Sequence, residues 1–452
     1  WMLRSKPYGA LALVFLLAAN VTEPVWVLIL LHLLFFFVAS MVCHGRLADD
    51  RPPVSHLTEF YLWMSIGGVL GGIFNALIAP SIFNHVLEYP LMIVVACLLC
   101  PNRTDKRGGA LATLADFAVP IAIAGLTVAL AVATSGMSPE AAALRNLYAL
   151  GLPVVLCFLL VNRSRRFGLG LAAVLVSGSF VLSPRGEALF AERNFFGVSR
   201  VTVSPMGDAH QMFHGNTLHG KQYTDPRRKG LPLAYYHPDG PLGNILGNEA
   251  LMRGRERIGV IGLGAGTMAA YAKPGQEWTY YEIDPLVIRL ATSSSYFTFL
   301  EDSEADEISI VPGDARLKIR GAGDGEFDLI VLDAFSSDSI PTHLVTREAL
   351  ATYLEKLSPT GLLVFHVSNR YLDLEPIVAA LAKDAGIRCL TRLDEAGEEG
   401  EEAAHWMVMS PDEASLDQVI AEGERWIYVH ARDSVAVWTD DYSNILAVLK
   451  WN

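Results

Sequence analysis

The chain has 452 residues, of which 52% are hydrophobic, and carries a formal net charge of −13 at pH 7. The charge is uneven: residues 1–184 hold 11 Lys and Arg against 8 Asp and Glu, and residues 185–452 hold 24 against 40. An acidic second half argues against a nucleic-acid partner and is compatible with a cationic substrate. The length allows about three domains.

Apolar runs dominate the first 184 residues. They lack a polar face and several approach the ~20 residues needed to cross a bilayer, which favours a transmembrane helical domain over a soluble all-helical one. Because Trp1 stands inside such a pattern, we expect the native chain to begin further upstream. Seven runs are expected, at residues 8–22, 24–43, 59–79, 86–100, 111–134, 147–162 and 168–183.

Basic residues between the runs bear on the membrane topology. If every run spans, the basic residues of segments 46–51, 103–107 and 163–166 lie on one side, which the positive-inside rule makes cytoplasmic. An odd number of spans then places the second half outside. The sequence leaves open whether a short run fails to span or the second half faces outward.

Two features of this half could carry chemistry. Asp116 lies near the end of a run, so we expect it at the membrane interface and not on a transport pathway. Cys97 and Cys100 form a CxxC pair, but the surrounding stretch is apolar, so we expect small buried or lipid-facing residues. The five cysteines indicate no disulfide framework.

Short alternating strands begin near residue 195. Residues 201–203 and 210–214 are typical of hairpin strands, and glycines and prolines punctuate the loops between them. We expect a small β domain over residues 195–245. A helix at 242–253 then leads into the last predicted domain, residues 246–452.

The strongest motif lies at residues 258–284. An apolar run at 258–261 is typical of a buried strand; a glycine-rich loop and a helical stretch follow, then a second apolar run at 278–283. Glycines let the backbone approach a ligand at a helix N-terminus, and an acid about 20 residues on can accept hydrogen bonds from a ribose. Because strand and acid stand where this mechanism requires them, the motif predicts nucleoside-cofactor binding and not an ordinary glycine turn.

Strands and helices continue to alternate up to residue 409. Strands are expected at 308–311, 327–332, 361–367, 387–390 and 405–409, and helices at 346–357 and 374–385. This pattern predicts an α/β fold with a mostly parallel sheet, whose ligand lies beyond the carboxyl ends of the strands. For any single acid at a strand end, helix capping is the alternative role. The expected cofactor-binding residues are Gly262, Gly264, Gly266, Glu282, Asp284 and Asp314.

A second pair of acids lies where the reacting end of the ligand is expected. Asp333 follows a buried strand, and Asp338 stands on the same loop. Two carboxylates beside a cofactor suit a cationic amine, because they attract it, orient it and can take its proton during attack. Tyr236 could hydrogen-bond the same amine, and three histidines are further possible partners. They are His214, His219 and His237, and their spacing predicts no metal site.

Residues 198–450 resemble the spermidine/spermine synthase (polyamine aminopropyltransferase) family. The motifs that carry the resemblance are VIGLGAG at 260–266, YEID at 281–284, GDA at 313–315, FDLIVLDAFSSDSIP at 327–341 and AYYHPDGPLG at 234–243. With its apolar first half, the chain is also similar to bacterial membrane-fused spermidine synthase-like proteins. That similarity rests on CHGRLADDRP at 43–52, FYLWMSIGGVLGGIFNALIAP at 60–80 and TDDYSNIL at 439–446.

The resemblance implies a small β domain followed by a Rossmann-like methyltransferase fold. It implies decarboxylated S-adenosylmethionine as aminopropyl donor, a di- or polyamine as acceptor, methylthioadenosine as by-product, and no metal. Asp333 would be the catalytic acid/base, and Asp338 and Tyr236 would hold the amine. Gln222 and His237 would also line the substrate site.

The resemblance also implies a setting for the protein. We expect a multi-pass protein of a bacterial inner membrane with a cytoplasmic catalytic domain, although the loop charges conflict with that side. The expected partners are a polyamine and the lipid bilayer, and a homodimer is one arrangement that the sequence leaves open.

Two departures from the family keep other functions open. Ala265 stands where the family has an Asp that holds the donor's aminopropyl ammonium, and extra residues separate Asp333 from Asp338. Losing a carboxylate weakens selection for a donor that lacks its own carboxylate. The alternatives are a methyltransferase that uses ordinary S-adenosylmethionine and a transport protein whose second half senses a polyamine or nucleoside.

Overall fold

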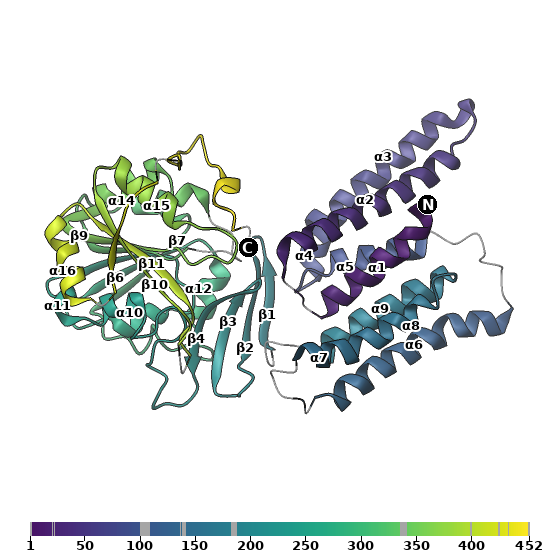
Figure 1. Cartoon of the computed structure of the whole chain (residues 1–452), viewed down its shortest axis with the longest axis horizontal. Helices are drawn as coiled ribbons and strands as arrows, with labels where there is room; N and C mark the ends of the chain where they lie inside the picture. The colour runs from purple at the N-terminus through teal and green to yellow at the C-terminus, as the bar shows by residue number, and fades with distance from the viewer. Residues whose placement is uncertain are drawn as a thin grey trace. The chain divides into compact units, whose positions relative to one another are not determined.

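The chain folds as two compact units, Trp1–Pro184 and Arg185–Asn452, each with its own hydrophobic core (Figure 1). The computed structural model describes residues 2–19, 21, 23–99, 109–135, 137, 142–181, 188–334, 341–397, 400–423, 425–432 and 434–450. Cys100 and the basic segment 103–107 lie outside these residues.

The described part of the first unit is helical, and the predicted apolar runs fall on its helices, with the runs at 59–79 and 147–162 each covering more than one helix. Three are long and apolar enough to cross a membrane: Val25–Asp49, Val54–Ile82 and Ala110–Ala133. The helices are α1 Met2–Ala18, α2 Val25–Asp49, η1 Val54–His56, α3 Leu57–Ile73, η2 Phe74–Ile78 (a π-helix), α4 Ala79–Ile82, α5 Glu88–Leu99, α6 Ala110–Ala133, α7 Ala142–Asn146, η4 Leu147–Gly151, α8 Leu152–Phe158 and α9 Ser164–Val181.

An ion pair joins two of these helices. Arg166 of α9 donates to Asp116 of α6 over 2.6 Å and to the carbonyl of Ala112 over 3.0 Å. Such a partner offsets the cost of placing either charge near an apolar medium. Asp116 therefore has a structural partner within its own unit. Cys97 is buried in the helical core.

The second unit begins with a four-stranded antiparallel sheet in the order β1-β2-β3-β4. Its strands are β1 Ala188–Asn194, β2 Gly197–Val203, β3 Ala209–His214 and β4 Thr217–Tyr223. The predicted hairpin strands correspond to β2 and β3. The sequence pattern did not predict β1 and β4, because β1 precedes the expected start of the β domain at residue 195 and β4 is rich in polar residues.

An eight-stranded sheet forms the rest, in the order β12-β10-β11-β9-β8-β5-β6-β7. Pairings from β7 through β9 are parallel and β11 is antiparallel to both neighbours, which confirms a mostly parallel sheet. The strand order reverses between β5 and β8, where ligands bind in such sheets. The strands are β5 Arg257–Ile261, β6 Glu277–Glu282, β7 Glu307–Pro312, β8 Phe327–Leu332, β9 Leu357–His366, β10 Arg388–Asp394, β11 Ala404–Ser410 and β12 Ile427–Val429.

Helices cover this sheet, and two differ from expectation. The helix expected at 242–253 is two short helices, because the Asn248 side chain caps the second by accepting from the amides of Ala250 and Leu251. After the glycine loop stands only the 3₁₀ helix η5, so no long helix points its N-terminus at the loop. The helices are α10 Pro241–Leu246, α11 Glu249–Met252, η5 Thr267–Tyr271, α12 Pro285–Ala291, α13 Ala315–Ile319, η6 Thr342–Leu344, α14 Arg347–Lys356, α15 Glu375–Asp384, α16 Glu413–Glu422 and η7 Ile445–Val448.

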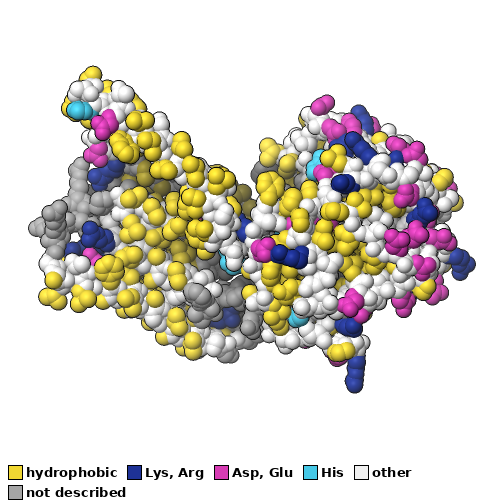
Figure 2. Space-filling view, turned by 180° about the vertical axis from the view of Figure 1, so that it is seen from behind, with side chains coloured by type: hydrophobic (Ala, Val, Ile, Leu, Met, Phe, Trp, Pro, Cys, Tyr) yellow, Lys and Arg dark blue, Asp and Glu magenta, His cyan; other side chains and the backbone are white. Residues whose placement is uncertain are grey.

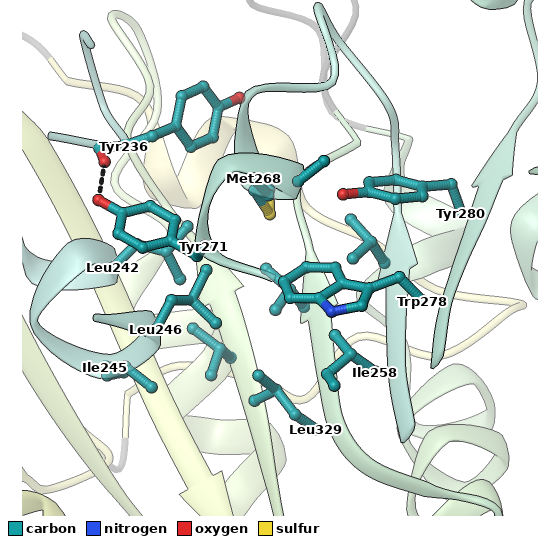
Figure 3. Packing of buried hydrophobic residues seen from close by; sticks show 14 of the residues in the cluster. Tyr236, Leu242, Ile245, Leu246, Ile258, Met268, Tyr271, Trp278, Tyr280 and Leu329 are labelled. Carbon is teal, nitrogen blue, oxygen red and sulfur yellow. Dashed lines mark hydrogen bonds between the residues drawn. The ribbon is translucent and has the colours of Figure 1, made fainter. Parts of the chain in front are cut away.

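The two faces of the sheet bury different residues, as period-two alternation requires. Val260 and Leu329 lie in one hydrophobic cluster, and Ile261 and Ile330 lie in the other. Figure 3 shows Trp278, Met268 and the α10 side chains packed in the first cluster. There the Tyr271 hydroxyl donates to the Tyr236 carbonyl, which ties the loop that carries Tyr236 to the core.

Surface composition differs between the units. On the face in Figure 2, Asp and Glu side chains gather on the second unit, and the described surface of the first unit is mostly hydrophobic. Large apolar side chains of α2 and α3 are strongly exposed, including Phe36 at 66% and Trp63 at 64%. An apolar surface of this extent indicates contact with lipid or protein.

A buried ion pair also contacts the loop that carries Tyr236. Arg392 and Asp394 are 1% and 3% exposed, lie 2.6 Å apart, and Arg392 also donates to the Asp239 carbonyl over 2.8 Å. Arg425 adds a second cation to Asp394 at 3.0 Å. A buried charge keeps its place only while its partner remains.

Asp394→Asn should therefore destabilise the second unit. It leaves the buried Arg392 without its countercharge, which costs about 3–5 kcal/mol and should lower the unfolding midpoint by roughly 10 °C. Thermal unfolding of the purified protein in detergent, followed by tryptophan fluorescence, measures this. Glu395→Gln, one residue away and exposed, is the control; an equal midpoint in both variants would contradict the prediction.

Candidate functional site

The glycine loop after β5 is packed between two other segments. Gly262, Gly264 and Gly266 have φ values of +100°, +53° and +77°, where L side chains are strained. A Cβ on Gly262 would lie 2.3 Å from the Asp333 carbonyl oxygen, and one on Gly264 would lie 2.6 Å from the His219 carbonyl oxygen. The first two glycines are thus needed for conformation and for close approach to β8 and β4.

The Glu282 side chain holds this loop through hydrogen bonds to backbone amides. Its two carboxylate oxygens accept from the amides of Leu263 and Asp284, at 3.0 and 2.8 Å. The side chain is 8% exposed, and burial raises its pKa to about 7 against the opposing effect of these hydrogen bonds. Glu282 therefore changes charge near neutral pH.

Asp284 and Asp314 each cap a helix, which was the alternative role for a single acid. Asp284 accepts from the Leu286 amide at 2.8 Å and from the Asn194 side chain at 2.5 Å. Asp314 accepts from the Leu317 amide at 3.0 Å, and its second oxygen lies 3.1 Å from His343 Nε2. Both still line the cavity described next, so capping and ligand contact are compatible.

A first cavity opens at the carboxyl ends of β5, β6 and β8. It is lined by Gly262, Gly264, Glu282, Asp284, Asp314 and Asp333, with His214, His219 and His343 at its sides. Gly266 lies away from it, against Leu300. Among the described lining residues there are four carboxylates and neither Lys nor Arg, so the cavity favours a cationic ligand.

Asp333 follows β8 and holds two hydrogen bonds. The Tyr236 hydroxyl donates to one oxygen at 2.5 Å, and His366 Nδ1 lies 2.7 Å from the other. Burial and the Asp333 charge raise the pKa of the Tyr236 hydroxyl well above its usual value, so Tyr236 remains a donor. The Asp333 side chain is 10% exposed and lines the first cavity.

His366 is a site residue that the sequence reasoning missed. It ends β9, its Nε2 lies 2.8 Å from the Ser368 hydroxyl, and its ring stacks on Trp406 with centroids 4.3 Å apart. The signal that could have found it is its position, because β9 lies beside β8 and ends at the same edge of the sheet. The rule that selected Asp333 would have selected His366 too.

A second cavity, of about 740 Å³, lies on the other side of Asp333. Its lining includes Tyr236 and His366, and it shares only Asp333 and His219 with the first cavity. Burial lowers the pKa of His219 to about 4, and its Nε2 has no hydrogen-bond partner among the described residues. A neutral imidazole therefore stands beside the carboxylate where the cavities meet. Further polar lining is Asp373, Glu402, Arg370 and Lys450.

The other predicted substrate-binding residues are Asp338, Gln222 and His237. Asp338 falls outside the described residues. Gln222 is buried and bonded to the Lys229 carbonyl and to Thr298, and it lines neither cavity. His237 also lines neither cavity and accepts from the Asp239 amide at 3.3 Å.

Ala265 supplies no polar group to the site. It is 0% exposed, and a Cβ on Gly220 would lie 2.4 Å from its own Cβ, so its side chain points at β4. Asp440 also has a structural role: both its oxygens accept from Arg316, at 2.6 and 2.7 Å. Within the described parts of the chain, no cluster of His, Cys, Asp and Glu could hold a metal ion.

The chain is similar to curated enzymes of known class. A polyamine aminopropyltransferase of Vibrio vulnificus (strain CMCP6) is 35% identical over 165 residues, 35% of this chain and 52% of that protein. A probable polyamine aminopropyl transferase of Bifidobacterium longum (strain NCC 2705) is 27% identical over 221 residues, 47% of this chain and 46% of that protein.

These relatives bear on part of the chain, which spans about half of their length. No family model matches the chain. A probable spermidine synthase from Corynebacterium glutamicum ATCC 13032 superposes with a TM-score of 0.41 at 16% identity, over 56% of this chain and 98% of that one. The α/β fold of the second unit follows from its own strand order.

Gly262→Ala should destabilise the protein more than the control Gly275→Ala, which changes a glycine with a similar positive φ. Gly275 also has positive φ (+87°), but a Cβ there would meet nothing within 4 Å. We expect the control to lose about 1–2 kcal/mol of unfolding free energy through backbone strain alone. Gly262→Ala should lose roughly 1–3 kcal/mol more, because the added Cβ overlaps Asp333. Thermal unfolding of both variants measures the difference; equal losses would show that close approach contributes nothing.

Proposed function

We propose that the chain transfers an aminopropyl group from decarboxylated S-adenosylmethionine to a di- or polyamine and releases methylthioadenosine. The observation that carries this proposal is the position of Asp333 between two cavities. A group-transfer enzyme must bring a donor and an acceptor together at one point. The relatives named as aminopropyltransferases support the reaction class.

The first cavity suits the donor. Glu282, when ionised, can accept from ribose hydroxyls, and Asp314 can accept from an adenine amino group. Decarboxylated S-adenosylmethionine carries a sulfonium and an ammonium, and the lining carboxylates attract both. The carboxylate of ordinary S-adenosylmethionine would meet neither Lys nor Arg among the described lining residues. This charge pattern favours the decarboxylated donor even though Ala265 contributes no acid.

The second cavity suits the acceptor. Asp333, Asp373 and Glu402 can receive its ammonium groups, although Arg370 and Lys450 line the same cavity. The acceptor nitrogen attacks the aminopropyl carbon bonded to sulfur; the new C–N bond forms as the C–S bond breaks. The bonding pair passes to sulfur, and the neutral thioether leaves. Asp333 takes the proton that the new ammonium group releases.

We also propose that the first unit anchors this activity in a bacterial inner membrane, with the second unit in the cytoplasm. Three apolar helices and the exposed apolar side chains of α2 and α3 support the anchor. Supply of the donor inside the cell supports that side. The basic residues in the loops of the first unit predict the opposite side of the membrane. Labelling of a single surface cysteine on the second unit in intact cells would decide between the two sides.

Asp333→Asn should abolish methylthioadenosine release. An amide cannot take the proton, so we expect kcat to fall about 10²–10⁴-fold while methylthioadenosine still binds. Full-length protein in detergent would be incubated with decarboxylated or ordinary S-adenosylmethionine and with putrescine or spermidine. Release only with the decarboxylated donor supports aminopropyl transfer. A methylated product from ordinary S-adenosylmethionine would instead indicate a methyltransferase. Binding of the donor without release of methylthioadenosine would indicate a sensor.

Methylthioadenosine should bind about tenfold more weakly at pH 6 than at pH 8. Glu282 has a pKa of about 7, so lowering the pH through 7 protonates it and removes the charge that accepts from the ribose. Titration calorimetry at both pH values measures the ratio. Glu282→Gln is the control, because its affinity should be lower and independent of pH; an unchanged pH dependence in this variant would contradict the assignment.

A further inference from the structure

We propose that His366 is a positioning residue for the proton transfer: held as the Nδ1–H tautomer by Ser368, it donates to Asp333 and fixes the orientation of that carboxylate. This inference rests on the proposed function for its kinetic consequence only. The tautomer itself is a property of the folded chain and can be tested without turnover.

The Ser368 hydroxyl determines the tautomer. Its oxygen accepts from the His405 amide at 2.7 Å, so its own proton is available to one other acceptor. Two acceptors are in range, His366 Nε2 at 2.8 Å and the His405 carbonyl at 3.5 Å. A hydroxyl hydrogen bond is normally 2.5–3.0 Å long, so the proton points to Nε2. A carboxylate oxygen only accepts, so the 2.7 Å contact with Asp333 requires the ring proton on Nδ1, and the Ser368 hydroxyl is placed to donate to Nε2.

That proton faces the Asp333 carboxylate. His366 Nδ1 lies 2.7 Å from one oxygen, and the Tyr236 hydroxyl lies 2.5 Å from the other. Each oxygen thus has one lone pair occupied by a fixed donor and one remaining for the acceptor amine. Because His366 Nδ1 already carries a proton, it does not accept the amine's proton. Asp333 takes that proton and later gives it to solvent, and His366 keeps its own throughout.

Packing keeps the imidazole in this orientation. The His366 ring is 7% exposed; it stacks on Trp406 at 9° between planes and contacts Tyr235 at 5.2 Å between centroids. Ser368 on one edge and Asp333 on the other leave the ring one hydrogen-bonded orientation. Carboxylate, imidazole and hydroxyl thus form a chain in which each member orients the next, as a catalytic site requires.

Titratable groups beside the His366–Asp333 pair include His219 from β4 and Tyr235 and Tyr236 from the loop before α10. The cavity that holds the pair is also lined by His405, Arg370, Asp373, Glu402 and Lys450. Tyr236 donates to one Asp333 oxygen and His366 lies at the other, so the two donors do not compete for one oxygen.

A pair of substitutions isolates the donated hydrogen bond. His366→Asn keeps an N–H near the position of Nδ1, whereas His366→Leu has similar bulk and no donor. We expect kcat for methylthioadenosine release to fall about 100-fold in His366→Leu and less than tenfold in His366→Asn, with an acceptor KM within about threefold of wild type in both. Methylthioadenosine should bind both variants with wild-type affinity, because His366 does not line the first cavity. Equal kcat losses in the two variants would overturn the positioning role.

The tautomer is tested directly by ¹⁵N NMR of full-length protein with labelled histidine, using His366→Asn to assign the signals. The expected spectrum shows His366 with a protonated Nδ1 and an unprotonated Nε2 at pH 7.5, and Ser368→Ala should remove the preference. A protonated Nε2 in wild type, or no effect of Ser368→Ala, would overturn the inference. If wild type releases no methylthioadenosine with any amine, the proposed reaction fails, and the spectrum still decides the tautomer.

Discussion

The close approach of the Gly262 backbone to that of Asp333 is the contact on which the rest of the site depends. These residues follow β5 and β8, the neighbouring strands at which the strand order reverses. A Cβ on Gly262 would lie within 2.3 Å of the Asp333 carbonyl, so only glycine lets both strand ends share this space. The contact sets the floor of the first cavity and the position from which the Asp333 carboxylate reaches Tyr236 and His366.

Burial decides which nearby groups carry charge. Desolvation raises the pKa of Glu282 to about 7 and lowers that of His219 to about 4, so one acid and one base both tend toward their neutral forms. Asp333 lines the same cavity and has two hydrogen-bonded neighbours, Tyr236 and His366. In the proposed reaction, the Asp333 carboxylate would both attract the cationic amine and take its proton.

The two units expose different kinds of side chain. The first exposes large apolar side chains and neutralises Asp116 with Arg166 inside its own helices. The second covers a mostly parallel sheet with helices and exposes carboxylates to water. The division matches the change in composition at residue 184, because each solvent selects the side chains that face it.

Sequence pattern by itself determined the apolar helices of the first unit, the strands of the eight-stranded sheet other than β12, and the acids at the strand ends. Period-two and period-3.6 burial and the rule for parallel sheets are local properties, so Glu282, Asp314 and Asp333 could be selected without coordinates. Tertiary structure decided which of the polar side chains share a cavity. Gln222 and His237 are satisfied elsewhere, and His366 reaches Asp333 because β9 pairs with β8. The strand-end rule could have selected His366 as a candidate, but its contact with Asp333, 33 residues away in sequence, depends on that pairing, which no local pattern encodes.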